Sequence, residues 1–228
     1  AKGVISIVIH GLGLSGSNSE KAITKLPADI TLVLSPYALE PDFWREEARA
    51  DGHEIWLSLP METRNLFSND TGPLTLLTDS SVDTLQNKIL TTLARATGYA
   101  GIIATRGSIF YSAELEAREG IKEIFERGLG YVDASTEIMY VPQSVAVSYD
   151  APYAHADLWL DDTATPEAIR KQMEKLKTLA RQRGYAVAFA NARHVSIEEI
   201  ARTAQSLRSE GYLLAPLSAQ LSSEPGTQ

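Results

Sequence analysis

Residues 4–19 read VISIVIHGLGLSGSNS, and the apolar run from Val4 to Ile9 leads directly into a glycine-rich turn. The residues after the turn, from about Ser19 to Leu26, have the composition of a helix. A strand, a glycine turn and a helix in this order are typical of α/β proteins, whose functional loops follow the carboxyl ends of the strands. We therefore expect the first functional loop to begin at His10.

Length and composition favour one large α/β domain, which we expect over residues 1–218, followed by a flexible tail at 219–228. The chain has 228 residues, of which 44% are hydrophobic, so it is able to bury a substantial core. Its formal net charge of −8 argues against non-specific binding to nucleic acid, which requires a basic surface. Between the periodic segments, residues 63–78 are predicted to form a long loop over the carboxyl edge of the sheet.

The chain contains no cysteine, which excludes disulfides, thiolate metal sites and a cysteine nucleophile. This composition suits an oxidising compartment. No apolar run approaches the ~18–20 residues that span a bilayer. Because the chain begins at Ala1 and not at a methionine, we expect any targeting segment to have been removed.

Strand and helix signals alternate along the chain, which fits a (β/α) barrel or an open doubly wound sheet. The expected strands are 4–9, 30–35, 53–59, 101–105, 130–133, 144–148, 157–160, 186–190 and 211–217. Several are nearly continuous apolar runs, as in strands buried on both faces of a parallel sheet. Thr165 and Pro166 predict a helix start and Gly184 its end, while Ser196 and Glu199 form a capping-box pattern.

The glycine turn permits a first interpretation as a dinucleotide-binding loop. The sequence GLGLSG at 11–16 has the spacing Gly-x-Gly-x-x-Gly between a strand and a helix. Such a fold also needs an acidic residue ~20 positions on, at the end of the second strand. Here that strand ends in SPY at 35–37, with Asp29 before it and Glu40 beyond it. We therefore favour a tight turn without a phosphate-binding role.

A second interpretation depends on short motifs spread along the chain. These motifs are GLGLS at 11–15, TLVLSPYA at 31–38, GHEI at 52–55, LPME at 59–62, NDTGP at 69–73, GYAG at 98–101, YVD at 131–133 and LWLD at 158–161. In this order and spacing they resemble the divergent polysaccharide deacetylase family of bacterial envelopes, distant relatives of the NodB-type carbohydrate esterases. The resemblance runs from Val4 to about Ser218 and implies a distorted (β/α) barrel of about seven strands.

The resemblance also implies a chemistry, which is metal-assisted hydrolysis of an N-acetyl group. In the family, an Asp and two His hold a divalent ion, typically zinc, which polarises the amide and activates water. A carboxylate acts as the general base, and another histidine protonates the leaving amine. The expected site lies at the carboxyl ends of the strands.

This sequence departs from the family pattern at nearly every one of these positions. The Asp-Asp pair that ends the family's first strand is replaced by His10 and a glycine. The histidine before Leu-Pro-Met-Glu is Ser58, and Thr105 and Arg106 stand in the stretch that supplies another ligand. The late Gly-His-Pro becomes Ala-Asn-Ala, with Asn191 at its centre. We expect Arg106 to place a fixed positive charge near the former metal position.

We therefore predict a degenerate pocket without catalytic residues, bound metal or cofactor. Its candidate residues are His10, Ser58, Thr105, Arg106, Asp133, Asp161 and Asn191. Neutral hydroxyls such as those of Ser58 and Thr105 bind Zn²⁺ weakly, so they are poor replacements for the family's ligands.

Two alternatives keep an active enzyme. His155 and His194 could join His10, Asp133, Asp161 and Asp162 in a rebuilt metal or acid–base site, although no pair has the spacing His-x-x-x-His. His53, at the start of an expected strand, is interpreted as structural. A Ser–His–Asp hydrolase is disfavoured because the chain has no Gly-x-Ser-x-Gly motif.

The predicted function is that of a pseudoenzyme of the bacterial envelope, periplasmic or secreted. It would bind glycan or peptidoglycan, or an envelope protein partner, with no nucleic acid and no membrane span. The alternative is an active metal-dependent carbohydrate N-deacetylase, or another carbohydrate hydrolase with a rebuilt site. Candidate stacking residues are Tyr37, Trp44, Trp56, Tyr99, Tyr111 and Trp159, of which Trp56 and Trp159 are expected to be structural because they lie within strands.

Overall fold

The structure is a computed structural model that describes residues 1–64, 71–104, 106 and 108–221. The strands are β1 (Gly3–Leu12), β2 (Thr31–Leu34), β3 (Ile55–Leu59), β4 (Gly101–Ala104), β5 (Gly130–Asp133), β6 (Tyr153–His155), β7 (Leu158–Trp159), β8 (Tyr185–Asn191) and β9 (Tyr212–Leu214). The α-helices are α1 (Gly16–Lys25), α2 (Pro41–Ala50), α3 (Val82–Leu93), α4 (Glu114–Phe125), α5 (Tyr140–Tyr149), α6 (Pro166–Arg183) and α7 (His194–Leu207). Two short 3₁₀ helices, η1 (Phe110–Ser112) and η2 (Leu217–Gln220), complete the described elements.

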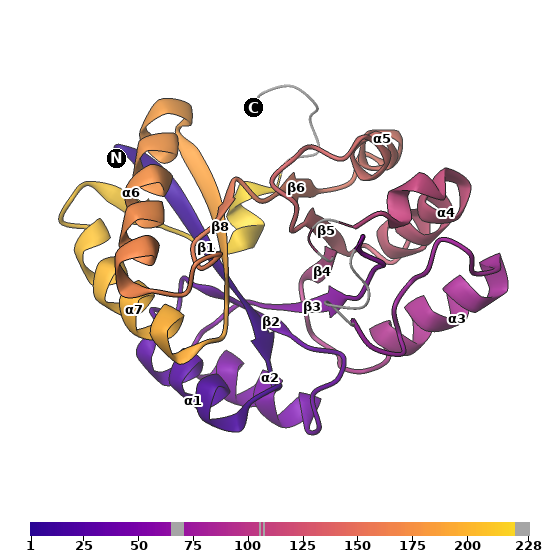
Figure 1. The fold of residues 1–228 in the computed structure, drawn as a ribbon, viewed down its shortest axis with the longest axis horizontal. Coiled ribbons are helices and arrows are strands. Elements are labelled where there is room, and N and C mark those ends of the chain that lie inside the picture. Colours follow the sequence, from indigo (N-terminus) through magenta and orange to yellow (C-terminus); the bar gives the residue numbers. More distant parts are fainter. Residues whose placement is uncertain (65–70, 105, 107, 222–228) are drawn as a thin grey trace.

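All pairings between these strands are parallel, and together they form one curled sheet. The strand order is β6-β5-β4-β3-β2-β1-β8-β7, with β9 paired to the amino-terminal part of β1. Because the path begins at β6 and ends at β7, the sheet forms a half-open barrel, with the helices along its outer side (Figure 1). This arrangement confirms the expected distorted (β/α) barrel.

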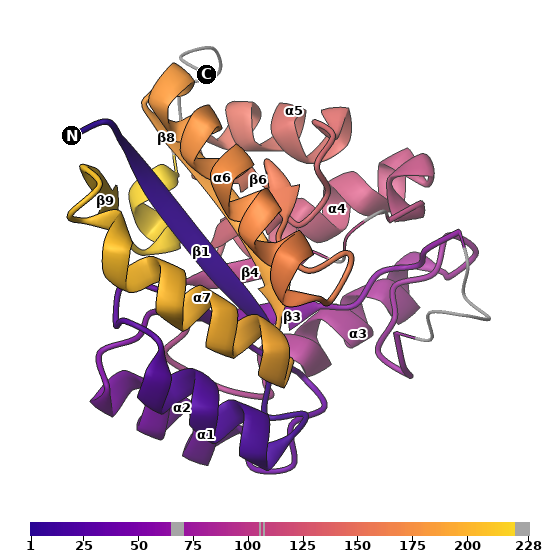
Figure 2. The ribbon, with the colours of Figure 1, turned by 60° about the vertical axis from the view of Figure 1, so that its left-hand side comes forward.

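Helices α6 and α7 cover the outer side of β1 and β8 (Figure 2). The ends of α6 follow from its sequence. The Thr165 side chain accepts a hydrogen bond from the Ala168 amide at 3.3 Å, and Pro166 occupies the first turn, where its missing N–H costs nothing. Gly184 ends the helix with a φ of 88°, a conformation that favours glycine. Both predicted ends of this helix are confirmed.

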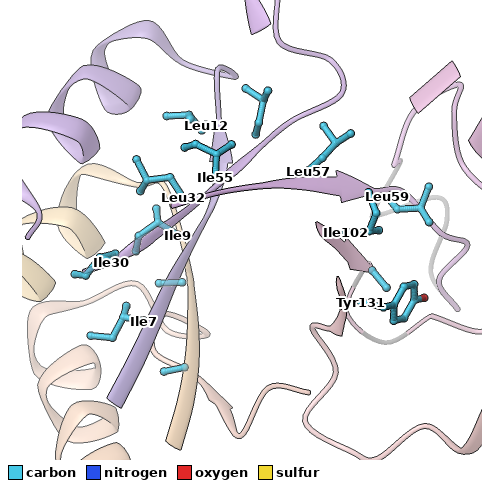
Figure 3. Close-up of a cluster of buried hydrophobic side chains, with 14 of the residues drawn as sticks. Ile7, Ile9, Leu12, Ile30, Leu32, Ile55, Leu57, Leu59, Ile102 and Tyr131 are labelled. Atoms are coloured by element: carbon cyan, nitrogen blue, oxygen red, sulfur yellow. The ribbon is translucent and has the colours of Figure 1, made fainter. Parts of the chain in front are cut away.

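Side chains along each strand alternate between the outer side and the interior of the barrel. In β1, Ile7 and Ile9 belong to the cluster under the helices, whereas Val8 packs in a second cluster inside the barrel. Figure 3 shows part of the outer cluster, in which Ile7, Ile9, Leu12, Ile30, Leu32, Ile55, Leu57, Leu59, Ile102 and Tyr131 are labelled. Each large apolar side chain buried in this way contributes roughly 1.5–3 kcal/mol. By the same alternation, His10 faces inward with Val8.

The expected strand at 144–148 is wrong, because these residues belong to helix α5. Val141, Val145 and Ala146 are buried on one side of that helix, in the outer core cluster. A short apolar run fits a strand and a buried helix turn equally well, and in this chain residues 144–148 form a helix. The strand at this place is β6, which begins shortly after the helix and pairs with β5.

The predicted capping box at the start of α7 is also wrong. The helix begins at His194, with Arg193 as its N-cap and no side-chain cap hydrogen bond. Ser196 and Glu199 therefore lie inside the helix, and both are buried. Ser196 donates its hydroxyl hydrogen to Asp161 at 2.8 Å instead of capping the helix.

The glycine-rich segment forms a tight turn, as predicted, and the turn is closely packed. Gly11 and Gly13 have φ values of 102° and 86°, which L-residues with a side chain rarely adopt. A Cβ on Gly13 would lie 2.4 Å from the Cβ of Ala38 in the loop after β2. Ser15 then caps α1 by accepting a hydrogen bond from the Asn18 amide.

The last described part of the chain is ordered by η2, in which Leu217 is fully buried. The predicted tail at 219–228 begins within this short helix, and its residues 222–228 lie outside the described residues. In the predicted loop at 63–78, residues 65–70 also lie outside them. None of the described helices is long and apolar enough to cross a bilayer.

Candidate functional site

A cleft of about 620 Å³ opens at the carboxyl ends of the strands, and we call it the central cleft. His10, Ser58 and Asn191 line it from the ends of β1, β3 and β8. Arg106 and Trp159 line it from the loop after β4 and from β7. Since parallel strands end at one edge of the sheet, residues far apart in the sequence meet here.

His10 and Ser58 are hydrogen-bonded to each other inside the central cleft. The His10 Nε2 and Ser58 Oγ atoms lie 2.9 Å apart. His10 belongs to β1 and Ser58 to β3, the two strands on either side of β2. Burial lowers the pKa of His10 from its ordinary 6.5 to about 4, because desolvation penalises the imidazolium. The imidazole is therefore neutral at pH 7, and the pair is uncharged.

Asp161 holds the part of the cleft that is next to His10, at the ends of β8 and β7. Its carboxylate accepts hydrogen bonds from the Asn191 amide at 3.0 Å, the Asn191 side-chain Nδ2 at 3.2 Å and the Ser196 hydroxyl at 2.8 Å. Arg193 adds an ion pair at 3.6 Å. Although it lines the cleft, Asp161 is only 1% exposed, so it acts as an anchor that joins the end of β7 to β8 and α7.

Arg106 and Asp162 form an ion pair at the rim of the cleft. The guanidinium contacts both carboxylate oxygens, with the Nη2–Oδ2 contact at 3.2 Å. It also lies over the ring of Trp159, 5.0 Å from the ring centroid. Arg106 therefore brings its fixed positive charge to the cleft, where the carboxylate of Asp162 balances it. Trp159 packs in the inner core and is only 7% exposed, as expected of a structural residue, and it also lines the cleft.

Asp133 does not join the central cleft. Val132 and Ala134 face the barrel interior, so Asp133, which lies between them, faces the outer side. There its Oδ1 accepts a hydrogen bond from the Ser135 amide at 2.7 Å, beside the hydroxyl of Tyr111. Burial is the largest influence on its carboxyl and raises its pKa. The prediction that Asp133 lines the pocket is therefore wrong, because it placed this side chain on the inner face of β5 instead of the outer face.

The other histidines are spread over the molecule, and the structure does not group them with His10. His194 lies on the surface, where its Nδ1 is 3.2 Å from Lys21 Nζ. His155 faces outward beside Asp133, and its Nδ1 is 3.0 Å from the Ala156 carbonyl oxygen. His53 is buried between backbone carbonyls, as expected of a structural residue.

The predicted stacking residues divide into two groups. Tyr37 and Trp159 line the central cleft, and Tyr111 lines a neighbouring cavity. The others lie elsewhere: Trp56 in the inner core with its Nε1 donating to Glu54, Trp44 against the glycine turn, and Tyr99 near the amino end of β4. Sequence reasoning missed Thr63, Arg193 and Tyr140 at these cavities, because isolated polar and aromatic loop residues carry no periodic signal.

The donor set of the central cleft does not fit the divalent ion of the deacetylases. Among the described residues, no three His, Cys, Asp or Glu side chains are grouped as they would be around a metal ion. His10 is the one imidazole lining the described cleft, Ser58 is a weak neutral donor, and Asp161 is already bonded to its neighbours. Thr105 lies outside the described residues. That the protein holds no metal stays a prediction.

A half-open parallel α/β barrel with its cleft at the carboxyl ends of the strands is the NodB-like fold. The chain belongs to the divergent polysaccharide deacetylase family, whose model matches residues 7–221. The resemblance seen in the sequence is thereby confirmed.

Solved structures that are similar to this chain include the following two. One is the uncharacterized protein ATU2773 from Agrobacterium tumefaciens C58, with 29% identity and a TM-score of 0.91 over 96% of this chain and 89% of that one. The other is a mutant of BA3943, described as a CE4 family pseudoenzyme with restored enzymatic activity. It shares 11% identity and the fold, with a TM-score of 0.55 over 96% of this chain and 66% of that one. No curated protein matches the chain.

Proposed function

We propose that this protein is a pseudoenzyme that binds N-acetylated glycan, such as peptidoglycan, in the central cleft without hydrolysing it. The observation that carries the proposal is the set of residues at the strand ends. His10 is hydrogen-bonded to Ser58, and Asn191 is held by the buried Asp161. These groups occupy the inward-facing positions where the deacetylase chemistry needs a base and metal ligands.

The described residues of the central cleft supply few of the groups that hydrolysis needs, namely a general acid, a general base and metal ligands. Loss of a general acid or base alone typically costs 10²–10⁴ in rate, and loss of the metal removes the Lewis acid and the activated water together. With a pKa of about 4, His10 is uncharged at pH 7 but a weak base. No carboxylate orients His10 among the described contacts, which include only Ser58 as its partner.

The same cleft retains what a sugar-binding site needs. Binding sites combine apolar surface with a few polar groups that fix the ligand. Tyr37 supplies aromatic surface along the cleft, and Trp159, beneath Arg106, lines it although the residue is mostly buried. A guanidinium has five N–H donors, and Arg106 uses two in its described contacts with Asp162. A sugar hydroxyl or amide oxygen could therefore accept from Arg106 without breaking the ion pair.

The proposal includes a place in the bacterial envelope, periplasmic or secreted, which the family membership and the absence of cysteine support. An envelope protein is the second possible partner for the same cleft. The BA3943 structure is described as that of a CE4 pseudoenzyme, so this fold does occur in a protein without native activity. An active enzyme with a rebuilt site remains the alternative that the following experiments test.

The binding test is calorimetric titration of the protein with β-1,4-linked N-acetylglucosamine tetrasaccharide and with peptidoglycan fragments. We expect saturable binding that weakens about tenfold in Arg106→Ala, as for one hydrogen bond from a charged donor. Arg127→Ala is the matched control, because Arg127 forms a similar surface ion pair with Glu123 on α4, away from the cleft. Absence of binding to every glycan would reject the glycan ligand in favour of a protein partner.

The activity test measures bound metal by elemental analysis and acetate release with Zn²⁺, Co²⁺ or Mn²⁺. We expect substoichiometric metal and no acetate release. Stoichiometric metal together with turnover that His10→Ala abolishes would reject the pseudoenzyme proposal and establish the active deacetylase.

A further inference from the structure

A groove of about 730 Å³ lies on the outer side of the barrel between helix α6 and strand β7, and we call it the α6 groove. In a (β/α) barrel a helix normally follows each strand and covers the outer side of the sheet. Here β6 and β7 are joined by Ala156 and Asp157 alone, so none of the described helices connects them. β6 therefore lies between α5, which packs on α4, and α6, which packs on α7 (Figures 1 and 2). The missing connection leaves the α6 groove open.

The α6 groove adjoins the central cleft. Arg106, Trp159 and Asp162 line both spaces. Along α6 the lining extends from Lys171 to Leu179, which is roughly 12 Å of helix at 1.5 Å per residue. This length corresponds to about three or four residues of an extended peptide. A molecule bound in the central cleft is therefore able to continue into the α6 groove by a short branch.

Three carboxylates line the α6 groove, and each of them already has a cationic partner. The ion pairs are Asp157–Arg183 at 2.7 Å, Asp162–Arg106, and Glu174–Lys177 at 2.8 Å. Asp157 also accepts a hydrogen bond from the Val187 amide at 2.7 Å, which fixes it against β8. The acidic side chains of the groove are therefore neutralised by the protein itself.

Two lysines of the same groove have no such partner. Lys171 and Lys175 line it one helical turn apart, and neither forms an ion pair or a side-chain hydrogen bond within the described part of the chain. Like charges at positions i and i+4 of a helix repel each other, so an anion between them would stabilise the arrangement. The groove thus carries two uncompensated positive charges in a chain whose formal net charge is −8.

Apolar side chains complete the lining. Leu158 of β7 and Leu179 of α6 are half-buried, and both line the groove together with the edge of Trp159. Binding sites combine such apolar surface with a few polar groups that fix the ligand. A neutral sugar would leave both ammonium groups without an anion. A short acidic peptide fits better, because its carboxylates pair with the lysines while its methyl and methylene groups pack on the leucines.

We infer that the α6 groove binds the acidic peptide that branches from a peptidoglycan chain whose sugars lie in the central cleft. Lys171 and Lys175 pair with carboxylates of this peptide, and Leu158 and Leu179 contact its apolar parts. The inference rests on the proposed function and makes its ligand more specific. The protein distinguishes peptidoglycan that carries its peptides from a neutral glycan of the same sugars.

The test compares three ligands by calorimetric titration. They are the neutral N-acetylglucosamine tetrasaccharide, a disaccharide–tripeptide fragment of peptidoglycan with free carboxylates, and the same fragment with its carboxyl groups amidated. The double variant Lys171→Gln/Lys175→Gln removes the two charges at exposed positions. Its matched control is Arg181→Gln/Arg208→Gln, which removes two charges from exposed arginines of the same protein that line neither the α6 groove nor the central cleft.

The inference predicts that the lysine double variant weakens binding of the acidic fragment about threefold to tenfold, as for two partly exposed ion pairs. Amidation of the fragment is expected to weaken its binding to the parent by a similar factor. In 1 M salt, where the Debye length is about 3 Å, both differences shrink. The arginine control is expected to bind all three ligands as the parent does, and the lysine variant to bind the tetrasaccharide unchanged.

The outcomes separate the α6 groove from the central cleft. If the tetrasaccharide binds and Arg106→Ala weakens it, while the lysine variant binds the acidic fragment as tightly as the parent, the peptide groove is rejected and the central cleft stands. Equal affinity of the parent for the acidic and the amidated fragment also rejects the groove. If neither the tetrasaccharide nor either fragment binds the parent, the proposed glycan function and the peptide groove are both rejected.

Discussion

The neutral imidazole of His10 predicts a specific loss of stability in acid, which the variant His10→Gln is expected to remove. Glutamine keeps an amide that is able to hydrogen-bond with Ser58 but does not titrate. In the folded protein the pKa of His10 is about 4, and in the unfolded chain it returns to 6.5. Between these two pH values the unfolded chain binds a proton that the folded protein does not. Stability therefore falls as the pH is lowered from 6.5 to 4, and is unaffected by this group above about pH 7.

The size of the effect follows from the two pKa values of His10, 6.5 in the unfolded chain and about 4 in the folded protein. At about 1.36 kcal/mol per unit, the loss is about 2 kcal/mol at pH 5 and about 3 kcal/mol at pH 4. His10 as a whole residue is half-buried at the cleft, and solvent there screens its charge, so these values are upper limits. The raised pKa of Asp133 works in the opposite direction, because its protonated form stabilises the fold at low pH and that contribution is lost as pH rises.

The assay is urea unfolding at pH 7.5, 6, 5 and 4 for the parent and for His10→Gln. The contribution of Asp133 is common to both proteins, so the difference between their unfolding free energies isolates His10. We expect this difference to change by about 2 kcal/mol between pH 7.5 and pH 5, in favour of the variant at low pH. Parallel pH profiles for the two proteins would refute the buried, neutral imidazole.

Three further predictions concern stability and are measured by urea denaturation at pH 7.5. Asp161→Ala is expected to cost about 3–5 kcal/mol, because it leaves the buried Ser196 hydroxyl and the Asn191 amide without their acceptor; a cost below 1 kcal/mol would contradict its role as an anchor. Gly13→Ala is expected to cost more than about 2 kcal/mol, since it combines a positive φ with the 2.4 Å approach to Ala38, and Gly184→Ala, which has open space around it, is expected to cost less. Glu198→Ala breaks a surface ion pair with Lys25 and is expected to leave the urea midpoint unchanged, since exposed ion pairs contribute little; a clear fall in the midpoint would contradict this expectation.

The features that sequence reasoning identified are those with a local physical cause. The first strand, the glycine turn and both ends of α6 follow from apolar runs, φ preferences and capping groups within a few residues. The errors arose where tertiary contacts decided the outcome. Ser196 lies inside α7, and its hydroxyl donates to Asp161 in the loop after β7. The residues of the capping-box pattern therefore do not cap the helix.

The same contrast between local causes and tertiary contacts holds for the residues of the central cleft. Alternation along the strands would place His10, Ser58 and Asn191 on the inner side, and all three line the central cleft. The same alternation, applied from Val132, would have placed Asp133 outside. No local rule could have shown that Asp162 neutralises Arg106, or that Thr63 lines a second cavity, because these contacts join loops from distant parts of the chain.

The position of β1 in the sheet has a consequence for how the chain folds during synthesis. One edge of β1 pairs with β2, and the amino end of the same edge with β9, while the other edge pairs with β8 along seven residues. β1 is the first strand to be synthesised. Its edges are fully paired only after β8 and β9, in the last third of the chain, have been synthesised. Until then an apolar ten-residue strand remains open to other chains. We expect folding to be slow, dependent on complete translation and sensitive to truncation before Leu214.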